Sequence, residues 1–528
     1  MHRLAAAGFC ALFIFSSPTS AQNDWKKGGT CYEVFVRSFY DSDGDGIGDL
    51  RGLIQKLDYI NDGDARSNRS LGARCIWLMP VAESPSYHGY DVTNYYRVNP
   101  QYGSNDDFKK LIVEAHRRGI RVLVDLVLNH ASSEHPFFQE ALNNPASPHR
   151  DWFRWSAMEP AGQEGWHKSP VRNEYYYGFF WSGMPDLNYE NPAVRDEAKK
   201  VATFWLREMG VDGFRLDAIP YLVEENGQRM HTRGTHAFLR EFAAHVRSVA
   251  PNAFTIGEVW DSTGAMLAYY PDQLDAHFAF DISNAIVAAV RTGSMKGLFP
   301  PVLRLQRELP ANRWSPFLRN HDQTRTMTEL GGSASRAKLA ATLLLTFPGL
   351  PFVYYGEEIG MTGDKPDPRL RTPMQWTRGH ASGFTRGTPW ESLQSDSSAA
   401  NVESEDGDQS SLLNVYRRLI HLRSTNSDIA SGELVPLDAG DDAVAAYVRR
   451  SRDHAVLVVA NLGTASLSKV RLSSMDHLLP AGLYDARNLL GRAPGASLRI
   501  GPDGRIDDYL PLPSLAPLES YLFQLSRR

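Results

Sequence analysis

Eight short apolar runs, each long enough for a strand, alternate along this chain with longer stretches of helical periodicity. The runs begin near Cys31, Cys75, Val122, Gly213, Phe254, Ala276, Pro316 and Phe352. Helical patterns lie between them, for example at 106–118, 192–209, 236–249 and 336–346, and Ser104 is placed to cap the first of these. Eight such repeats close into a parallel barrel. The sequence therefore predicts an α/β fold, a (β/α)8 TIM barrel.

Three acidic residues follow strand-like runs: Asp217 in VDGFRLDAIP, Glu258 in AFTIGEVWDS and Asp322 in SPFLRNHDQT. One acid near a strand end is usually a cap or a surface charge. Three are better explained by a shared site, because catalytic groups of such barrels lie at the C-terminal strand ends. Cleavage of a glycosidic bond needs two carboxyl groups, and a third carboxylate can raise the pKa of the proton donor. The three acids therefore favour a glycosidase.

Short motifs around these acids resemble a known family. DLVLNH (125–130), MPDLN (184–188), GFRLDA (213–218), IGEVW (256–260) and FLRNHD (317–322) occur in the order and rough spacing of sequence regions of the α-amylase family, glycoside hydrolase family 13. IWLMP (76–80), GLPFVYYGEE (349–358) and RTPMQW (371–376) also fit. The likeness runs from about Trp25 to about Trp376. It indicates a type intermediate between oligo-1,6-glucosidase-like and neopullulanase-like members.

The resemblance implies roles for the three carboxylates in a retaining hydrolysis. Asp217 is expected to be the nucleophile, Glu258 the acid/base and Asp322 the third carboxylate. Arg215 lies two residues before Asp217, so in a strand both side chains point to one face. The cation then favours the ionised form of the nucleophile.

The run SPSYHGYDV (84–92) resembles another part of the substrate cleft. Tyr90 resembles the aromatic platform under the sugar at the cleavage subsite. Exo-acting α-glucosidases of the family commonly have Asp-Asn-Gly-Tyr or Asp-Asp-Gly-Tyr here, whereas this chain has the Tyr87-His88-Gly89-Tyr90 form associated with endo-acting amylases. An aromatic pair can stack on a continuing glucan chain. The substrate-binding candidates are Tyr90, His130, Arg215, His321, Tyr87, His88 and Asp91.

The chain is expected to divide into five parts. Residues 1–21 form a signal peptide, and 22–130 and 186–427 form the two parts of the catalytic barrel. Residues 131–185, rich in Pro, Trp, Tyr, Phe and His, resemble the inserted domain B of the family, after the third strand. They show no convincing helical period. From 428 to 528, short alternating runs such as HAVLVVANL predict an antiparallel C-terminal β-sandwich domain.

The beginning of the chain and its charge bear on location and partners. A basic start, an apolar stretch and small residues at Thr19 and Ala21 are typical of a cleavable secretory signal, which predicts a secreted or periplasmic protein. The net charge of −5 argues against a nucleic-acid partner. After signal removal we expect a monomer without a membrane partner, acting on an α-glucan or maltooligosaccharide. Cys31 and Cys75 are expected to be two buried thiols rather than a disulfide.

Residues 41–49, Asp-Ser-Asp-Gly-Asp-Gly-Ile-Gly-Asp, have the composition of a calcium loop. Aspartates at every second position place hard oxygen ligands round one centre, and glycine allows the tight turn. We therefore expect bound Ca²⁺. Its expected ligands are Asp41, Asp43, Asp45, the carbonyl oxygen of Ile47, and Asp49.

The leading interpretation is an endo-acting α-amylase that cleaves α-1,4-glucosidic bonds in starch or maltooligosaccharides. Ala218, directly after the nucleophile, resembles α-1,4 enzymes, whereas RTPMQW resembles the oligosaccharide-acting branch. An α-glucosidase or a transglycosylase of the trehalose synthase type is the enzyme alternative, because it shares the covalent intermediate. A remote alternative is a non-catalytic carbohydrate-binding or transporter-associated relative. Such relatives usually lack one of the three carboxylates, all of which are present here.

Overall fold

The computed structural model describes residues 24–491 and 494–528, so the predicted signal peptide lies outside the described residues. Eight parallel strands form one sheet in the order β12-β11-β10-β9-β5-β2-β1-β13. They are β1 (Cys31–Val34), β2 (Cys75–Leu78), β5 (Arg121–Leu126), β9 (Gly213–Leu216), β10 (Phe254–Gly257), β11 (Ala276–Phe278), β12 (Trp314–Ser315) and β13 (Phe352–Tyr354). The α/β barrel predicted from the alternation of apolar runs is confirmed.

The two outermost strands of this sheet meet through backbone hydrogen bonds. Leu350 N donates to Trp314 O at 3.0 Å, and Phe352 N donates to Pro316 O at 2.9 Å. The strands are buried on both faces, as parallel sheets covered by helices are. The barrel is therefore nearly closed, and its C-terminal strand ends meet on one side.

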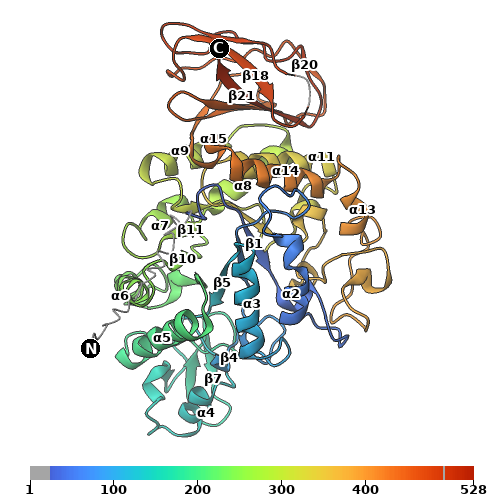
Figure 1. Ribbon diagram of the computed structural model, residues 1–528. Helices are drawn as coiled ribbons and strands as arrows, with labels where there is room; N and C mark the ends of the chain where they lie inside the picture. Colours follow the sequence, from blue (N-terminus) through green and yellow to red (C-terminus); the bar gives the residue numbers. More distant parts are fainter. Residues whose placement is uncertain (1–23, 492–493) are drawn as a thin grey trace, which may run out of the picture.

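Amphipathic helices cover the outside of the barrel (Figure 1). The helix α3 (Asn105–Arg117) begins at the predicted cap, because Ser104 Oγ accepts from Asp107 N at 3.2 Å and the Asp107 carboxylate accepts from Ser104 N at 3.2 Å. The other long helices are α2 (Leu50–Ile60), α5 (Pro192–Phe204), α6 (Arg233–Val249), α8 (Phe280–Thr292), α9 (Phe299–Glu308), α11 (Ala334–Thr346) and α14 (Leu412–Thr425). Among the described residues, none of the helices combines the length and the apolar character that crossing a membrane requires.

Cys31 and Cys75 form a disulfide bond, so the expectation of two separate thiols is wrong. The two residues are register partners on the adjacent parallel strands β1 and β2, and their Cα atoms are 4.5 Å apart. This separation lies within the range that a disulfide requires. The sequence indicates that both cysteines are in strands, but the pairing depends on the register of the sheet.

The segment that follows β5 forms a lobe at the far end of the molecule from the C-terminal domain (Figure 1). It contains α4 (Pro136–Asn143) and a three-stranded antiparallel sheet of β6 (Trp155–Ser156), β8 (Tyr175–Tyr177) and β7 (Trp166–Lys168). The helix was not expected, because the segment is short on helical periodicity. It begins at Pro136, and the preceding His135 caps it by accepting from Phe137 N at 3.2 Å.

The C-terminal part forms a six-stranded antiparallel sheet in the order β14-β15-β16-β21-β18-β19, and a two-stranded sheet of β17 and β20. It packs on α8, α9, α11, α14 and α15 (Ser427–Ser431) of the barrel (Figure 1). Its strands are β14 (Glu433–Pro436), β15 (Val444–Arg450), β16 (Ala455–Asn461), β17 (Leu467–Ser468), β18 (Gly482–Asn488), β19 (Leu498–Ile500), β20 (Ser514–Leu515) and β21 (Glu519–Arg527).

Two fully buried arginines bind carbonyl oxygens where the barrel meets this domain. Arg423 of α14 donates to Leu345 O at 2.9 Å and to Phe347 O at 2.8 Å. Arg449 of β15 donates to Thr346 O. Carbonyl groups in the last turn of a helix have no intrahelical donor, so the two guanidinium groups cap the C-terminus of α11.

We predict that Arg423→Met destabilises the protein by about 3 kcal/mol, because it leaves buried carbonyl oxygens without a donor. Differential scanning calorimetry should show a lower Tm. The control is Arg291→Met on α8, an exposed side chain whose ion pair with Glu329 measures 4.0 Å, and it should change stability by less than about 0.5 kcal/mol. Equal shifts in both variants would contradict the capping role.

Candidate active site

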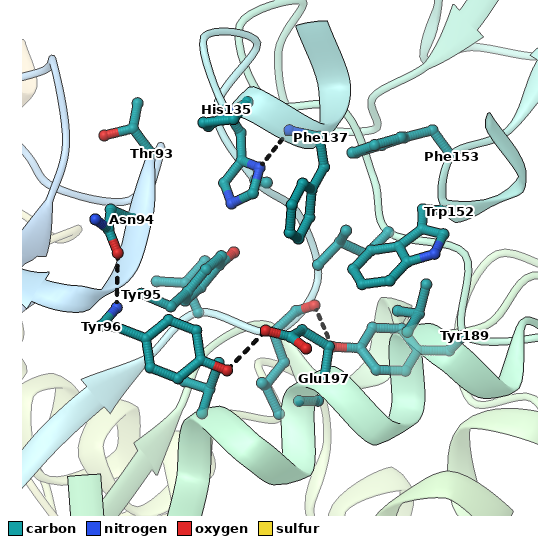
Figure 2. Close-up of a pocket in the computed structure, with 18 residues that line it drawn as sticks. Thr93, Asn94, Tyr95, Tyr96, His135, Phe137, Trp152, Phe153, Tyr189 and Glu197 are labelled. Carbon is teal, nitrogen blue, oxygen red and sulfur yellow. Dashed lines mark hydrogen bonds between the residues drawn. The ribbon is translucent and has the colours of Figure 1, made fainter. Parts of the chain in front are cut away.

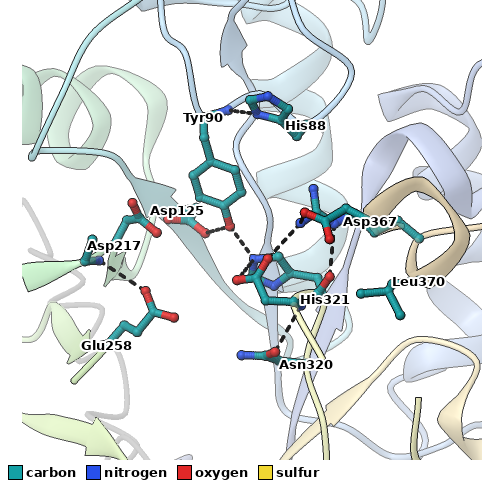
Figure 3. Close-up of polar contacts among 12 residues, drawn as sticks. His88, Tyr90, Asp125, Asp217, Glu258, Asn320, His321, Asp367 and Leu370 are labelled. Atoms are coloured by element: carbon teal, nitrogen blue, oxygen red, sulfur yellow. Dashed lines mark hydrogen bonds and ion pairs between the residues drawn. The ribbon is translucent and has the colours of Figure 1, made fainter. Parts of the chain in front are cut away.

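The C-terminal ends of the barrel strands surround a cleft of about 710 Å³. All three carboxylates predicted from the sequence line it, and so do three of the seven substrate-binding candidates and two exposed aromatic side chains. These lining residues are Asp217, Glu258, Asp322, His88, Tyr90, His130, Phe180 and Trp260. Figure 3 shows the polar groups at the bottom of the cleft.

Asp217 and Glu258 are brought together by adjacent strands and one arginine. Each directly follows its strand, and the last residues of β9 and β10 are register partners. Arg215 lies between the two acids, with Nη1 2.6 Å from Asp217 Oδ1 and Nη2 2.8 Å from Glu258 Oε2. Glu258 Oε2 also accepts from Ala218 N at 3.1 Å. Arg215 and Asp217 therefore share one face, as their spacing in a strand predicts.

Asp125 on β5 is a fourth carboxylate at this site, which the sequence reasoning did not assign. It is the register partner of Arg215, whose Nη1 is 2.9 Å from Asp125 Oδ1. Tyr90 donates its hydroxyl to Asp125 Oδ2 at 3.1 Å. Burial raises the pKa of Asp125 to about 7. Asp125 is the first residue of the DLVLNH motif. The sequence of one strand does not show which residue of the neighbouring strand will lie beside it.

Glu258 and Asp322 have pKa values moved in opposite directions. Burial raises the pKa of Glu258 to about 7, and nearby Asp217 and Asp322 act in the same direction. Burial would also raise the pKa of Asp322, but His321 and Arg371 outweigh it and hold that pKa well below its usual range. One carboxyl group can thus carry a proton near neutral pH beside another that stays ionised, which acid–base catalysis requires.

Both ring nitrogens of His321 have a partner, and Figure 3 shows the contact with Tyr90. Its Nδ1 lies 2.6 Å from Glu33 Oε1, and its Nε2 lies 2.7 Å from the Tyr90 hydroxyl and 3.1 Å from Asp322 Oδ2. The rings of His321 and Tyr90 stack, with centroids 5.6 Å apart. His321 does not line the cleft itself but lies behind Tyr90 and Asp322, and it fixes their positions.

His130 lines another part of the cleft and is almost fully buried. Within the described part of the chain, its Nε2 has no hydrogen-bond partner. Burial lowers the pKa of His130, so the ring is neutral near pH 7. A buried polar atom that faces a cleft without a protein partner is suited to bind a ligand hydroxyl.

The remaining candidates have different positions. His88 lines the cleft, but Tyr87 does not, because its ring stacks on Trp390 with centroids 5.3 Å apart. Asp91 is buried and accepts from the Ser84 hydroxyl at 2.7 Å. Its carboxylate is therefore bonded within its own loop and is not part of the lining of the cleft.

Arg371, in the RTPMQW motif, is a second residue of the site that the sequence reasoning did not assign. It lines the cleft, with Nη2 2.7 Å from Asp322 Oδ1, and its Nε donates to His321 O at 3.0 Å. Lys365 and Asp367, which form an ion pair, lie beside it in the lining. This charged group gives one part of the cleft a polar wall.

The predicted calcium loop brings three carboxylates together. Asp41, Asp43 and Asp49 each offer one oxygen, and these oxygens lie within 4.8 Å of one another. Asp45 is outside this group, and its Oδ1 accepts from Ile47 N at 2.8 Å. Three clustered carboxylate oxygens match the hard ligands that Ca²⁺ prefers. Asp49, the last residue of the loop, also caps the N-terminus of α2.

A separate cavity of about 250 Å³ lies between the inserted lobe, β4 (Asn94–Val98) and α5 (Figure 2). Tyr95 in its lining donates its hydroxyl to His130 O at 2.7 Å. The cavity therefore lies behind the cleft, and it includes none of the residues predicted to bind substrate. Most of the lining is aromatic or apolar, including Tyr95, Tyr96, Phe137, Trp152, Phe153 and Tyr189.

Two of the curated proteins most similar to this chain have different named activities. Alpha-amylase 3 of Dictyoglomus thermophilum is 40% identical over 446 residues, which cover 83% of this chain and 85% of that protein. Trehalose synthase/amylase TreS of Mycolicibacterium smegmatis is 36% identical over 513 residues, which cover 83% of this chain and 84% of that protein.

Solved structures and a family model agree with these relatives. The α-amylase from H. orenii has a TM-score of 0.83 and 37% identity, covering 95% of this chain and 100% of that chain. The trehalulose synthase MutB from Pseudomonas mesoacidophila MX-45 has a TM-score of 0.81 and 27% identity, covering 95% and 99%. The model of the α-amylase catalytic domain matches residues 33–432. With this match and the shared barrel, the chain belongs to the α-amylase family of glycosidases, enzymes that act on glycosidic bonds.

Proposed function

We propose that this chain is a retaining, endo-acting α-amylase that cleaves α-1,4-glucosidic bonds in starch or maltooligosaccharides. The observation that carries the proposal is the meeting of Asp217, Glu258 and Asp322 in one cleft, with Arg215 between the first two. The 40% identity to an α-amylase supports this activity. We also propose that the protein is secreted or periplasmic, which the signal-like N-terminal sequence supports, and that it acts as a monomer.

In this mechanism Asp217 is the nucleophile. Arg215 Nη1 lies 2.6 Å from Asp217 Oδ1 and places a positive charge beside the attacking carboxylate. Asp217 attacks the anomeric carbon as the glycosidic bond breaks, and Glu258 gives its proton to the departing oxygen. Its pKa of about 7 allows Glu258 to hold that proton. The ionised Glu258 then takes a proton from water, and the hydroxyl group replaces Asp217 on the sugar.

The other groups of the cleft bind and stabilise the sugar in this mechanism. Asp322 is kept ionised by His321 and Arg371, so it supplies negative charge to the oxocarbenium-like transition state. Tyr90 supplies a flat ring for stacking, and the free Nε2 of His130 can bind a sugar hydroxyl.

A trehalose-forming transglycosylase is the second candidate, because a relative at 36% identity is named Trehalose synthase/amylase TreS. Such an enzyme forms the same glycosyl ester but transfers the sugar to the anomeric hydroxyl of the released glucose instead of to water. The polar wall of Lys365, Asp367 and Arg371 suits a short substrate. Tyr87 stacks on Trp390 and is not part of the cleft lining. Of the aromatic pair that was expected to stack on a continuing glucan chain, only His88 is in the described lining of the cleft.

Replacing the nucleophile tests the catalytic assignment. Asp217→Asn should lower turnover by about 10⁴-fold or more, because an amide cannot form the glycosyl ester. Glu258→Gln should spare the first step for substrates with good leaving groups, since these need little protonation. The matched control is Asp212→Asn at the other end of β9, where the carboxylate pairs with Arg121 at 2.9 Å. Substantial starch hydrolysis by Asp217→Asn would overturn the assignment.

We further propose that the acidic loop binds Ca²⁺ through Asp41, Asp43, Asp45, Asp49 and the carbonyl oxygen of Ile47. Chelation should then lower the Tm, because an ion at 100 times its Kd stabilises the folded state by about 2.7 kcal/mol.

Asp43→Ala should remove much of the chelator-sensitive part of the Tm. Asp43 Oδ1 accepts a 3.2 Å hydrogen bond from Asp45 N, a contact within the turn itself. Asp64→Ala removes a similar turn contact, from Arg66 N at 2.9 Å, and serves as the control. If chelation leaves the wild-type melting curve unchanged, the loop holds no exchangeable ion.

Early products distinguish the two candidate functions. An endo-acting hydrolase should abolish the iodine colour of soluble starch quickly and form mixed maltooligosaccharides before glucose. Maltose should be a poor substrate, because it fills too few subsites to contribute the necessary binding energy. Chromatography of the products checks this. Conversion of maltose to trehalose, which removes reducing ends, would favour the transglycosylase, and glucose as the sole early product would favour an α-glucosidase.

A further inference from the structure

Four polar side chains form a continuous series of hydrogen bonds below the cleft. Glu33 on β1 is buried and lies 2.6 Å from His321 Nδ1, and His321 Nε2 lies 2.7 Å from the Tyr90 hydroxyl. Tyr90 in turn donates to Asp125 Oδ2 at 3.1 Å. Asp322 Oδ2 is a second acceptor, 3.1 Å from His321 Nε2. Through His321, these contacts connect strand β1 to the aromatic ring of Tyr90 and to the carboxylate of Asp322.

The positions of the protons follow from this geometry. Asp322 Oδ2 lies 3.1 Å from His321 Nε2, and Arg371, 2.7 Å from Asp322 Oδ1, helps to hold this carboxylate ionised, so Oδ2 can only accept. Nε2 must then carry a proton. An ionised carboxylate accepts only, so Nδ1, which faces Glu33, must carry a proton as well. A histidine with protons on both nitrogens is an imidazolium cation.

We propose that Glu33 is a positioning residue that fixes His321 as the doubly protonated imidazolium and thereby keeps Asp322 ionised and oriented toward the substrate. This proposal rests on the proposed role of Asp322 in catalysis. Glu33 does not line the cleft, so it acts through His321 and not on the sugar.

The charges around His321 agree with this assignment. Asp322 on its own loop, Glu33 on β1 and Asp125 on β5 are acidic, and Arg371 donates to the backbone oxygen of His321 rather than to the ring. Burial alone would lower the pKa of His321, but Asp322 and Glu33 raise it to about 10. The cation therefore persists as pH rises through neutrality, and removing the charge of Glu33 should lower the pH at which the ring loses a proton.

The test is the substitution Glu33→Gln, which keeps the size of the side chain and an oxygen that can still accept from Nδ1. We expect the pKa of His321 to fall by at least about one unit, a tenfold change in the ionisation constant. The readout is a ¹⁵N NMR titration of the histidine rings, with the His321 signals identified from their absence in His321→Gln. The ring is measured directly because Glu258, with a pKa of about 7, would dominate the basic limb of the activity profile.

The matched control replaces another buried carboxylate, that of Glu358, which follows β13 in the chain. Glu358 is fully buried and accepts from the hydroxyls of Tyr32 at 2.7 Å and Tyr59 at 2.6 Å. Glu358→Gln should leave the titration of His321 unchanged. An equal fall in Glu358→Gln would show a general loss of structure and contradict a specific role of Glu33.

Two results would overturn the proposal. They are the same His321 titration in wild type and Glu33→Gln, whatever the activity of the variant, and a neutral His321 ring in the wild type at pH 7. The second needs no variant, so the proposal stays falsifiable if Glu33→Gln does not fold. Failure of the proposed function would instead appear as activity in Asp217→Asn, and it does not affect the NMR readout.

Discussion

The buried guanidinium of Arg215 is the interaction on which the site depends. It contacts Asp125, Asp217 and Glu258, with its closest contacts to them between 2.6 and 2.9 Å. Burial and the neighbouring charge of Asp217 raise the pKa values of Asp125 and Glu258 to about 7, so the three acids around this one cation do not all ionise together near neutral pH. Breaking a buried pair is costly, so this arrangement is rigid. The rings of Trp77 and Tyr90 lie 5.0 and 6.0 Å from the guanidinium carbon and exclude water from it.

The barrel makes this arrangement possible because it fixes register. Arg215 is the register partner of Asp125 on one side and of Ile256 on the other. Asp217 and Glu258 each come two residues after one member of the second pair, so they lie at the same level of the barrel. The same register joins Cys31 to Cys75 across β1 and β2. The nearly closed barrel sheet thus holds charged groups from several distant segments of the chain at one site.

Much of this could be predicted from local patterns. The eight strands follow from short apolar runs, and the three carboxylates in the cleft from their places just beyond those runs. Ser104 caps its helix as its sequence context predicts. These features depend on neighbouring residues only, so a single sequence reveals them.

Features that depend on distant segments were missed. Asp125 and Arg371 stand in motifs that were recognised, but their partners lie 90 and 49 residues away. Tyr87 stacks on Trp390, about 300 positions later, a contact that its motif does not reveal. Asp91 is taken up by serines of its own loop. In each case the sequence shows the side chain but not what it faces.

The central claim is that Asp217 forms a covalent bond to the sugar while Arg215 and Glu258 assist it. It is tested most directly by mass spectrometry of Glu258→Gln after reaction with an α-glucosyl fluoride, whose fluoride leaves without protonation. Because the variant lacks the base for the second step, the glycosyl ester should accumulate. The account predicts one added glucosyl unit on the peptide that contains Asp217. A glucosyl unit on another residue, or turnover without any covalent adduct, would contradict it.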